Sequence, residues 1–206
     1  MTTTLIPDVA NILRVFARAD IADVNAGIDW YADARESAAE LAQRHGYSVE
    51  VAAGVISALS PLNEWSKNLR DADRVLGGDF TGCLGVSLDK ARRIMAGEDI
   101  VSVLHADKTV NFYLSILSAG KEGVCVDRHA FDIAVGFRSP DKNRSIGKRL
   151  YRDIAAAYTL AADIITSEGL PITPAEVQSV TWEEHRREWK DRRVSVLTPL
   201  FEVEYA

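Results

Sequence analysis

Two ionisable residues, Lys108 and Asp127, give the clearest indication of chemistry in this chain. Asp127 follows Lys108 by 19 residues, and the apolar stretch between them would end as a helix at Gly120. Asp127 can then cap a helix that starts at Arg128. Both groups would lie at helix N-termini, where the macrodipole stabilises a carboxylate and lowers the proton affinity of a lysine. Such a lysine is a nucleophile, and a nearby carboxylate can act as a base or stabilise positive charge.

The alternative is purely structural, with Asp127 as an N-cap and Lys108 as a solvated surface residue. His129, two residues after Asp127, is a candidate to orient a substrate or to exchange a proton near neutral pH. It could equally make a structural hydrogen bond to the preceding loop. Histidine, cysteine and carboxylate residues do not show the close spacing of a zinc site, so neither a metal nor a cofactor is predicted.

The region around both residues resembles the active-site segment of the helix-hairpin-helix (HhH-GPD) DNA glycosylase superfamily. In that family a Lys-Thr pair opens a helix and a Val-Asp-x-His segment supplies the catalytic aspartate, as Lys108-Thr109 and residues 126–129 do here. Residues 55–61, and the Trp65-Ser66-Lys67-Asn68 segment after them, resemble an earlier helix end of the family and the helix that follows it. The likeness spans about residues 51–136.

The chain is also similar to small bacteriophage proteins that share this glycosylase-like fold. The similarity rests on four segments, which are residues 27–31, residues 58–61, residues 108–113 and residues 126–130. Relatives of that group are proposed to act in the hypermodification of phage DNA pyrimidines. In that reaction an amino acid or amine is attached to an activated hydroxymethyl base.

These resemblances imply an all-α, HhH-GPD glycosylase-like fold with a degenerate hairpin, and a protein that acts on a modified or damaged base in DNA. The first expectation is base excision, with Lys108 as nucleophile, Asp127 as stabiliser of positive charge and His129 as a third catalytic residue. A hypermodification transferase and a binding or inhibitory module without catalysis are the alternatives. The substrate-binding residues that the resemblance implies are Ser60, Asn63, Trp65, Asn68, Asn111, Tyr113 and Arg128.

The chain departs from the glycosylase pattern immediately before Lys108. The family has a Leu-Pro-Gly-x-Gly hairpin whose backbone amides grip a DNA phosphate, whereas residues 103–108 here contain no glycine. A tight turn that presents amides is harder to form without glycine, and Asp107 adds a charge that repels phosphate. The chain has two cysteines, Cys83 and Cys125, which are too few for the family's four-cysteine iron–sulfur cluster. We therefore expect no cluster.

Composition predicts one globular domain. The chain has 206 residues, of which 47% are hydrophobic and 26% are charged, and this is enough apolar sequence for a normal core. We expect a domain over residues 1–193, with its motif region at 48–136, and a C-terminal tail over 194–206. No apolar run is long enough to span a membrane and the N-terminus does not resemble a signal peptide, so the expected location is the cytoplasm, that of the host if the protein is phage-encoded.

A net charge of −6 argues against DNA binding through bulk electrostatics, because such binding needs clustered lysine and arginine. Two basic stretches nevertheless occur, at residues 143–152 and 185–193. The second can be read as cations near the end of a helix or as a nucleic-acid face.

Periodicity predicts helices throughout and almost no strands. The expected helices cover about residues 8–19, 28–44, 49–59, 63–77, 87–97, 108–120, 128–136, 145–167 and 174–191, with a brief one that starts at Asp99 and ends before Lys108. The residues expected to begin helices are Asp8, Ser48, Ser87, Asp99 and Ser145, with a capping box at Thr173 and Glu176. Asn68 and Asn111 are either structural amides or readers of base edges. Several aromatic residues either belong to the core or form a pocket that stacks a base; they are Trp30, Tyr31, Trp65, Phe112, Tyr113, Trp182 and Trp189.

Overall fold

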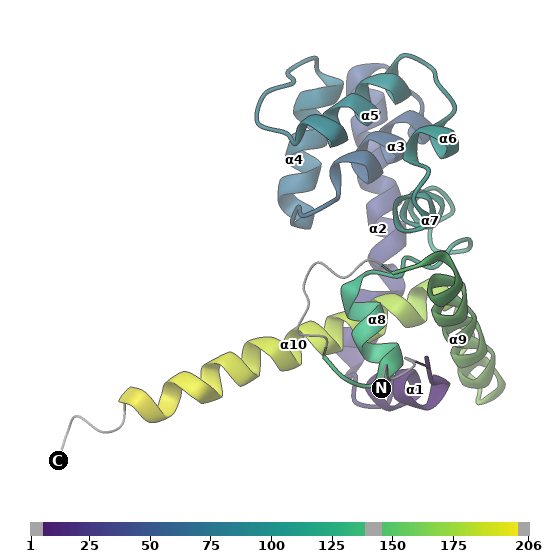
Figure 1. Cartoon of the computed structure of the whole chain (residues 1–206), viewed down its shortest axis with the longest axis vertical. Coiled ribbons are helices and arrows are strands. Elements are labelled where there is room, and N and C mark those ends of the chain that lie inside the picture. Colours follow the sequence, from purple (N-terminus) through teal and green to yellow (C-terminus); the bar gives the residue numbers. More distant parts are fainter. Residues whose placement is uncertain (1–5, 139–145, 202–206) are drawn as a thin grey trace.

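The protein is all-helical over the residues that the structure describes. The computed structural model (Figure 1) describes the backbone of residues 6–138 and 146–201, and within these ranges the side chains up to residue 187. The helices in this part of the chain are α1 (Val9–Phe16), α2 (Ile21–His45), α3 (Val49–Leu59), α4 (Trp65–Leu76), α5 (Gly85–Met95), α6 (Ile100–Leu104), α7 (Asp107–Leu117), α8 (Arg128–Val135), α9 (Lys148–Ser167) and α10 (Pro174–Phe201). The predicted all-α class is confirmed, and the described residues contain no strand.

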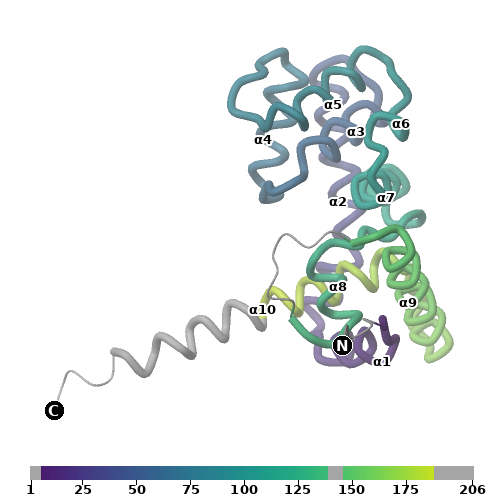
Figure 2. The backbone as a smooth tube through the Cα atoms, in the orientation of Figure 1, coloured from purple at the N-terminus to yellow at the C-terminus, as the bar shows by residue number. Residues whose placement is uncertain are grey.

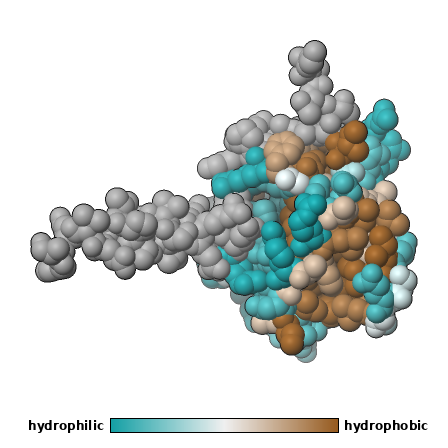
Figure 3. All heavy atoms as spheres, turned by 90° about the horizontal axis from the view of Figure 1, so that it is seen from below, coloured by the Kyte–Doolittle hydropathy of each residue, from teal (hydrophilic) through white to brown (hydrophobic). Residues whose placement is uncertain are grey.

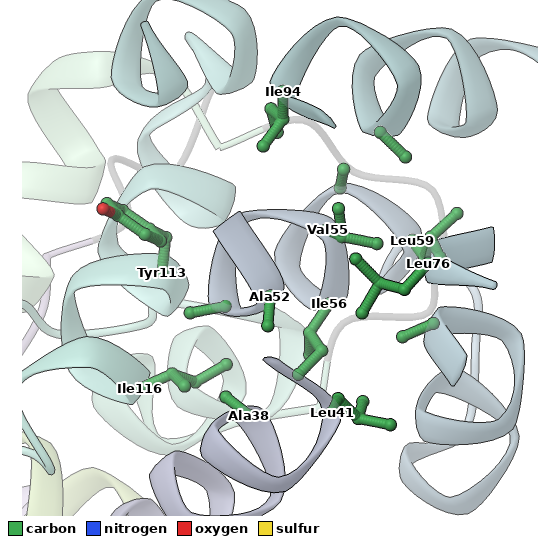
Figure 4. Close-up of a cluster of buried hydrophobic side chains, with 14 of the residues drawn as sticks. Ala38, Leu41, Ala52, Val55, Ile56, Leu59, Leu76, Ile94, Tyr113 and Ile116 are labelled. Atoms are coloured by element: carbon green, nitrogen blue, oxygen red, sulfur yellow. The ribbon is translucent and has the colours of Figure 1, made fainter. Parts of the chain in front are cut away.

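The buried apolar side chains form two clusters, which lie one above the other in Figure 1. The upper core joins the second half of α2 to helices α3 to α7, and Figure 4 shows part of it around α3. The lower core joins α1, α8, α9 and the first part of α10. Helix α2 takes part in both, because Tyr31 belongs to the upper core while Val24 and Ile28 pack against the lower one.

Helix α3 is the centre of the upper core. All of its residues from Ala52 to Leu59 are buried, as expected for a helix that is apolar almost all round. Burying a side chain the size of Ile56 or Leu59 contributes about 1.5–3 kcal/mol to stability, so this helix fixes the position of its neighbours. The tube in Figure 2 shows the long α2 running from this upper cluster down into the lower one.

Helices α2 and α10 cross at very short range inside the lower core. A Cβ atom added to Gly27 of α2 would lie 2.5 Å from the backbone of Val180 in α10. Such a distance is far inside van der Waals contact, so the crossing requires a residue without a side chain.

When the molecule is viewed from below, apolar side chains gather on one part of the lower surface and polar ones surround them (Figure 3).

Most predicted caps are confirmed. Asp8, Ser48 and Asp99 each accept a backbone N–H bond at the start of their helix. Thr173 and Glu176 form the expected capping box, because each side chain accepts the other residue's backbone N–H.

Several predicted boundaries are wrong, and three of them are instructive. Helix α2 begins at Ile21, well before Ile28, because Asp20 and Asp23 form a capping box there. Helix α5 begins at Gly85, and Ser87, the expected cap, is buried within it. Helix α10 continues to Phe201, past the expected end near residue 191, because the residues that follow contain no helix breaker before Pro199. The expected cap Ser145 lies outside the described residues.

Candidate active site at the junction of the two cores

The candidate site is built around a short extended segment, residues 124–127, that lies between the two cores. The N-termini of α7, α8 and α9 come together at this segment. The hydroxyl of Tyr151, in the first turn of α9, donates to the carbonyl of Val124 at 2.7 Å and accepts from the N–H of Val126 at 3.0 Å. Tyr151 is 5% exposed, so this pair of bonds is shielded from water and fixes the segment firmly.

Helix α7 holds the same segment from the other side. The side-chain oxygen of Asn111 accepts the N–H of Val124 at 3.4 Å, and its amide nitrogen donates to the carbonyl of Asp107. The thiol of Cys125 donates to the carbonyl of Lys108 at 3.8 Å. Asn111 is therefore a structural amide, one of the two roles expected for it.

Gly123 allows this close approach. Its φ is +81°, and an added Cβ would lie 2.8 Å from the carbonyl oxygen of Asn111. A residue with a side chain would be strained in this left-handed conformation and would also push the segment away from α7.

Asp127 caps α8 as the sequence predicts. Its carboxylate accepts the N–H of Ala130 at 2.8 Å, and the side chain is half-buried. Lys108 is the second residue of α7 and is exposed. Each of these charged residues therefore lies in or directly before the first turn of its helix, close to the segment that Asn111 and Tyr151 hold.

The charges of Lys108 and Asp127 both act on the buried thiol of Cys125. Burial raises the pKa of Cys125 to about 12, the ammonium of Lys108 lowers it and the carboxylate of Asp127 raises it further. The Cys125 thiol contacts the carbonyl of Lys108 and Asp127 lies two residues after Cys125, so the backbones of Lys108 and Asp127 lie in the same small region. The thiol itself stays protonated at neutral pH, which agrees with the expected role of Cys125 as a small buried residue.

Tyr31 of α2 extends this polar region toward the upper core. Burial raises the pKa of its phenol well above the ordinary value, and the nearby Cys125 and Asp127 raise it further. Its hydroxyl donates to Oε1 of Gln178 in α10 at 3.2 Å. The buried hydroxyl thus joins α2 to α10.

A half-buried group of aromatic rings adjoins the region. The ring of Trp30 lies 5.0 Å from that of Trp65 and 6.0 Å from that of Phe112, and Trp30 meets Tyr31 edge-on at 4.8 Å. Phe112 is four residues after Lys108 on α7, so both side chains project from one face of that helix. These three rings, Trp30, Trp65 and Phe112, are called the aromatic group below.

The remaining aromatic residues lie elsewhere. Tyr113 is buried on the other side of α7, where burial and the charges of Glu50 and Asp99 raise its pKa. Trp182 packs against His129 at 6.3 Å between ring centroids. The side chain of Trp189 lies outside the described residues. The aromatic residues expected to form one pocket therefore lie in separate places, and Trp30, Trp65 and Phe112 are the ones near Lys108.

Three predicted binding residues make hydrogen bonds to nearby groups around the α3–α4 connection. Ser60 donates to the carbonyl of Ser57 at 2.9 Å. Asn63 donates to the carbonyl of Leu59 and to the carboxylate of Asp71. Asn68 is 1% exposed and donates to the carbonyl of Ile56 at 3.0 Å, so its amide has a structural role here.

His129 and Arg128 lie on the side of α8 that faces α10. The rings of His129 and His185 are 5.4 Å apart, and Arg128 is half-buried beside them. Burial lowers the pKa of His129; the neighbouring Asp127 raises it, and Arg128 lowers it. The imidazole therefore stays neutral to lower pH than a free histidine does.

The turn before Lys108 forms without glycine. Helix α6 ends at Leu104, and His105 takes a left-handed conformation with φ +46° before Ala106 starts α7. The two helices are thus joined by a short turn in which His105 occupies a conformation that usually favours glycine. The backbone makes this turn although its formation without glycine was expected to be harder, and Asp107 opens α7.

Two residues of the site, Tyr151 and Gln178, were not expected from the sequence as contributors, and Tyr31 was expected only as a core or pocket ring. Their contacts join helices far apart in the chain, and a local pattern carries no signal for them.

Within the described ranges, no group of three or more His, Cys, Asp and Glu side chains is arranged so that it could hold a metal ion. The helices of the same ranges include none with the length and hydropathy needed to cross a membrane.

Comparison with known proteins identifies a family for this chain. No match was found among curated proteins or among solved structures. A family model described as a family of unknown function (DUF7178) matches residues 2–188, and this range covers all the helices that form the two cores and the candidate site. The chain therefore belongs to the DUF7178 family.

Proposed function

We propose that this protein acts on a base in DNA and that Lys108 and Asp127 are its reacting residues, in the manner of a glycosylase with a lysine nucleophile. One observation carries the proposal. The Cys125 thiol, two residues before Asp127, contacts the carbonyl of Lys108 at 3.8 Å, so the starts of α7 and α8 meet at one buried residue. This arrangement supports a reaction in which a lysine nucleophile and a carboxylate that stabilises positive charge act on one substrate.

The reaction begins with the neutral amine of Lys108. Its nitrogen attacks the anomeric carbon of the nucleotide, the bond to the base breaks, and the base leaves with that electron pair and takes up a proton. The carboxylate of Asp127 stabilises the positive charge that develops on the sugar. The sugar ring then opens, its ring oxygen takes the second proton of the amine, and a Schiff base joins Lys108 to the DNA.

The aromatic group supplies a surface for the base. Enzymes that act on a base must take it out of the helical stack, and aromatic rings commonly receive it. Trp30, Trp65 and Phe112 are half-buried and contact one another. Phe112 projects from the same face of α7 as Lys108, so a base stacked on this group would have its sugar near the lysine.

Helix α6 and the turn after it support the same proposal. They directly precede Lys108, at the point in the chain where the glycosylases carry their hairpin. Here the segment includes Asp107 in the first turn of α7, so its amides are a poorer site for phosphate than those of a glycine-rich turn. We therefore assign the segment to positioning Lys108 and look for the DNA contact elsewhere.

Borohydride trapping tests the proposal, because the reagent reduces a Schiff base to a stable amine. Duplexes that each carry one damaged or modified base are incubated with the protein and borohydride, and cross-linked species are separated by denaturing electrophoresis. We expect a cross-link with at least one duplex, and we expect Lys108→Ala to abolish it. Lys121→Ala is the matched control, because Lys121 is also exposed and follows the same helix.

Two results would contradict base excision by this route. One is the absence of any cross-link across the panel, and the other is a cross-link that survives Lys108→Ala. The transferase alternative remains a prediction from the sequence. It would gain support if no cross-link formed but mass spectrometry detected new nucleosides after incubation with DNA carrying activated hydroxymethyl pyrimidines and free amino acids.

A further inference from the structure

Directly after Asp127, the start of α8 packs against α10. Trp182, His185 and Arg186 are spaced so that they share one face of α10, and this face meets His129 of α8. The guanidinium carbon of Arg186 lies 4.3 Å above the centre of the Trp182 ring. The surface formed by Arg128, His129, Trp182, His185 and Arg186 is called the α8–α10 face below.

The charge exposed on this face is positive. Arg186 is exposed, and within the described side chains it makes no ion pair. Two carboxyl-bearing residues of these helices are turned inward, since Asp132 is 3% exposed and Glu184 is 5% exposed and pairs with Arg18, while Glu183 is half-buried. Arg186 is therefore an exposed cation without an ion pair among the described side chains, on a chain with a net charge of −6.

Arg186 and Trp182 together have the chemistry that a nucleic-acid strand requires. A stacked guanidinium keeps its N–H edge free for a phosphate, and its flat face rests on the indole at little cost in side-chain freedom. Arg128 adds a second guanidinium, whose buried Nε has no hydrogen-bond partner among the described residues. An unsatisfied buried donor of this kind is costly unless a ligand or water accepts its bond.

The position of the face matters as much as its composition. Arg128 and His129 directly follow Asp127, so anything bound to this face lies next to the carboxylate. Arg186 and Arg128 both lower the pKa of His129, which shows that their charges lie around the same imidazole.

Resting on the proposed function, we infer that the α8–α10 face binds the sugar–phosphate backbone of the DNA strand. It takes over the contact that the glycine-free segment before Lys108 does not provide. The phosphates meet Arg186 and Arg128, and the edge of Trp182 packs against the sugar or an unpaired base.

Fluorescence anisotropy with a short fluorescein-labelled oligonucleotide, single-stranded and as a duplex, tests this inference without any need for catalysis. We expect Arg186→Gln to weaken binding about tenfold for all sequences alike, and to reduce the slope of log affinity against log salt by about one. Arg186→Lys should keep that slope while binding more weakly, because the ammonium does not stack as the guanidinium does.

Arg187→Gln is the matched control. It removes the same charge one residue further along α10, but Arg187 is held by Asp23 at 2.8 Å, so DNA affinity should stay within about twofold of wild type. Equal losses in Arg186→Gln and Arg187→Gln, unchanged binding in Arg186→Gln, or no binding to either form of DNA at low salt would each overturn the inference. If Arg186→Gln binds DNA as well as wild type does and Lys108 is still trapped, the inference about the face fails but the proposed function stands. If binding depends on Arg186 but no trapping occurs, DNA binding by the face is supported and base excision is contradicted.

Discussion

The thiol of Cys125 donates to the carbonyl oxygen of Lys108 at 3.8 Å, and this contact joins the two segments that carry the candidate reacting groups. Lys108 belongs to α7 and Asp127 caps α8. A third helix completes the junction, because Tyr151 of α9 holds the backbone on both sides of Cys125. The account of function depends on this junction, and each part of it can be tested separately.

Asp127 has two roles that substitution can separate. Asparagine caps helices about as well as aspartate, so Asp127→Asn should leave stability almost unchanged while removing the charge that stabilises the sugar. Asp127→Ala should lose both, with a cost of about 1 kcal/mol in the free energy of unfolding. Urea denaturation and the rate of borohydride trapping measure the two effects. Full trapping activity in Asp127→Asn would show that its charge is not used.

Tyr151 positions the segment that leads to Asp127. Removing its hydroxyl in Tyr151→Phe leaves the N–H of Val126 and the carbonyl of Val124 buried without this partner, so we expect a loss of about 1–3 kcal/mol in the free energy of unfolding. Tyr158→Phe is the control, because that buried hydroxyl has only a 3.5 Å contact with Thr181. If the two substitutions lowered the free energy of unfolding equally, the two hydrogen bonds of the Tyr151 hydroxyl would contribute no more than the single contact of Tyr158.

Asp71 makes stability depend on pH. Burial raises its pKa, but hydrogen bonds from Lys67, Arg74 and Asn63 outweigh burial and bring the value to about 2. Because the folded-state pKa lies below the unfolded one, the stabilisation is full above about pH 4 and is lost as the pH falls toward 2.

The difference in unfolding free energy between wild type and Asp71→Asn reports this effect. We expect the wild type to be more stable by about 2 kcal/mol near neutral pH, and the difference to shrink on acidification through that range. Urea titrations at a series of pH values measure it. A difference that is independent of pH would show that the carboxylate contributes through packing and not through its charge.

The two thiols should differ in reactivity. Cys125 is 7% exposed and burial raises its pKa to about 12, whereas Cys83 is half-buried. Because the thiolate is the reactive form, a thiol reagent applied to the native protein should modify Cys83 first and Cys125 only after unfolding. We also expect Cys125→Ala to retain trapping, since the thiol is not the nucleophile. Loss of trapping in a folded Cys125→Ala protein would contradict the assignment of that role to Lys108.

The sequence predicts those parts of the structure that local chemistry decides. The caps at Asp8, Asp99 and Asp127, and the capping box at Thr173, are confirmed because each depends on residues within one turn. The start of α2 was missed although Asp20 and Asp23 have the same kind of local pattern. The apolar run of α3 correctly indicates a central helix.

The contacts that build the candidate site could not be predicted in the same way. Tyr151 meets Val126 across 25 residues and Tyr31 meets Gln178 across 147. A buried tyrosine has the same apolar periodicity whether its hydroxyl bridges a backbone segment or meets only one neighbour. Asn68 and Asn111 looked alike in the sequence, and only tertiary packing shows that the amide of Asn68 meets the backbone of α3 and that of Asn111 the backbone of Val124.

The most direct test of the central claim is to locate the borohydride-trapped DNA on the protein by peptide mass spectrometry. A duplex that gives a cross-link is trapped, the DNA and the protein are digested, and the peptide that carries the reduced sugar is sequenced. The account predicts that the modification lies on Lys108 and that its yield falls strongly in Asp127→Asn. A modification on another lysine or on the N-terminal amine, with Lys108 unmodified, would contradict it.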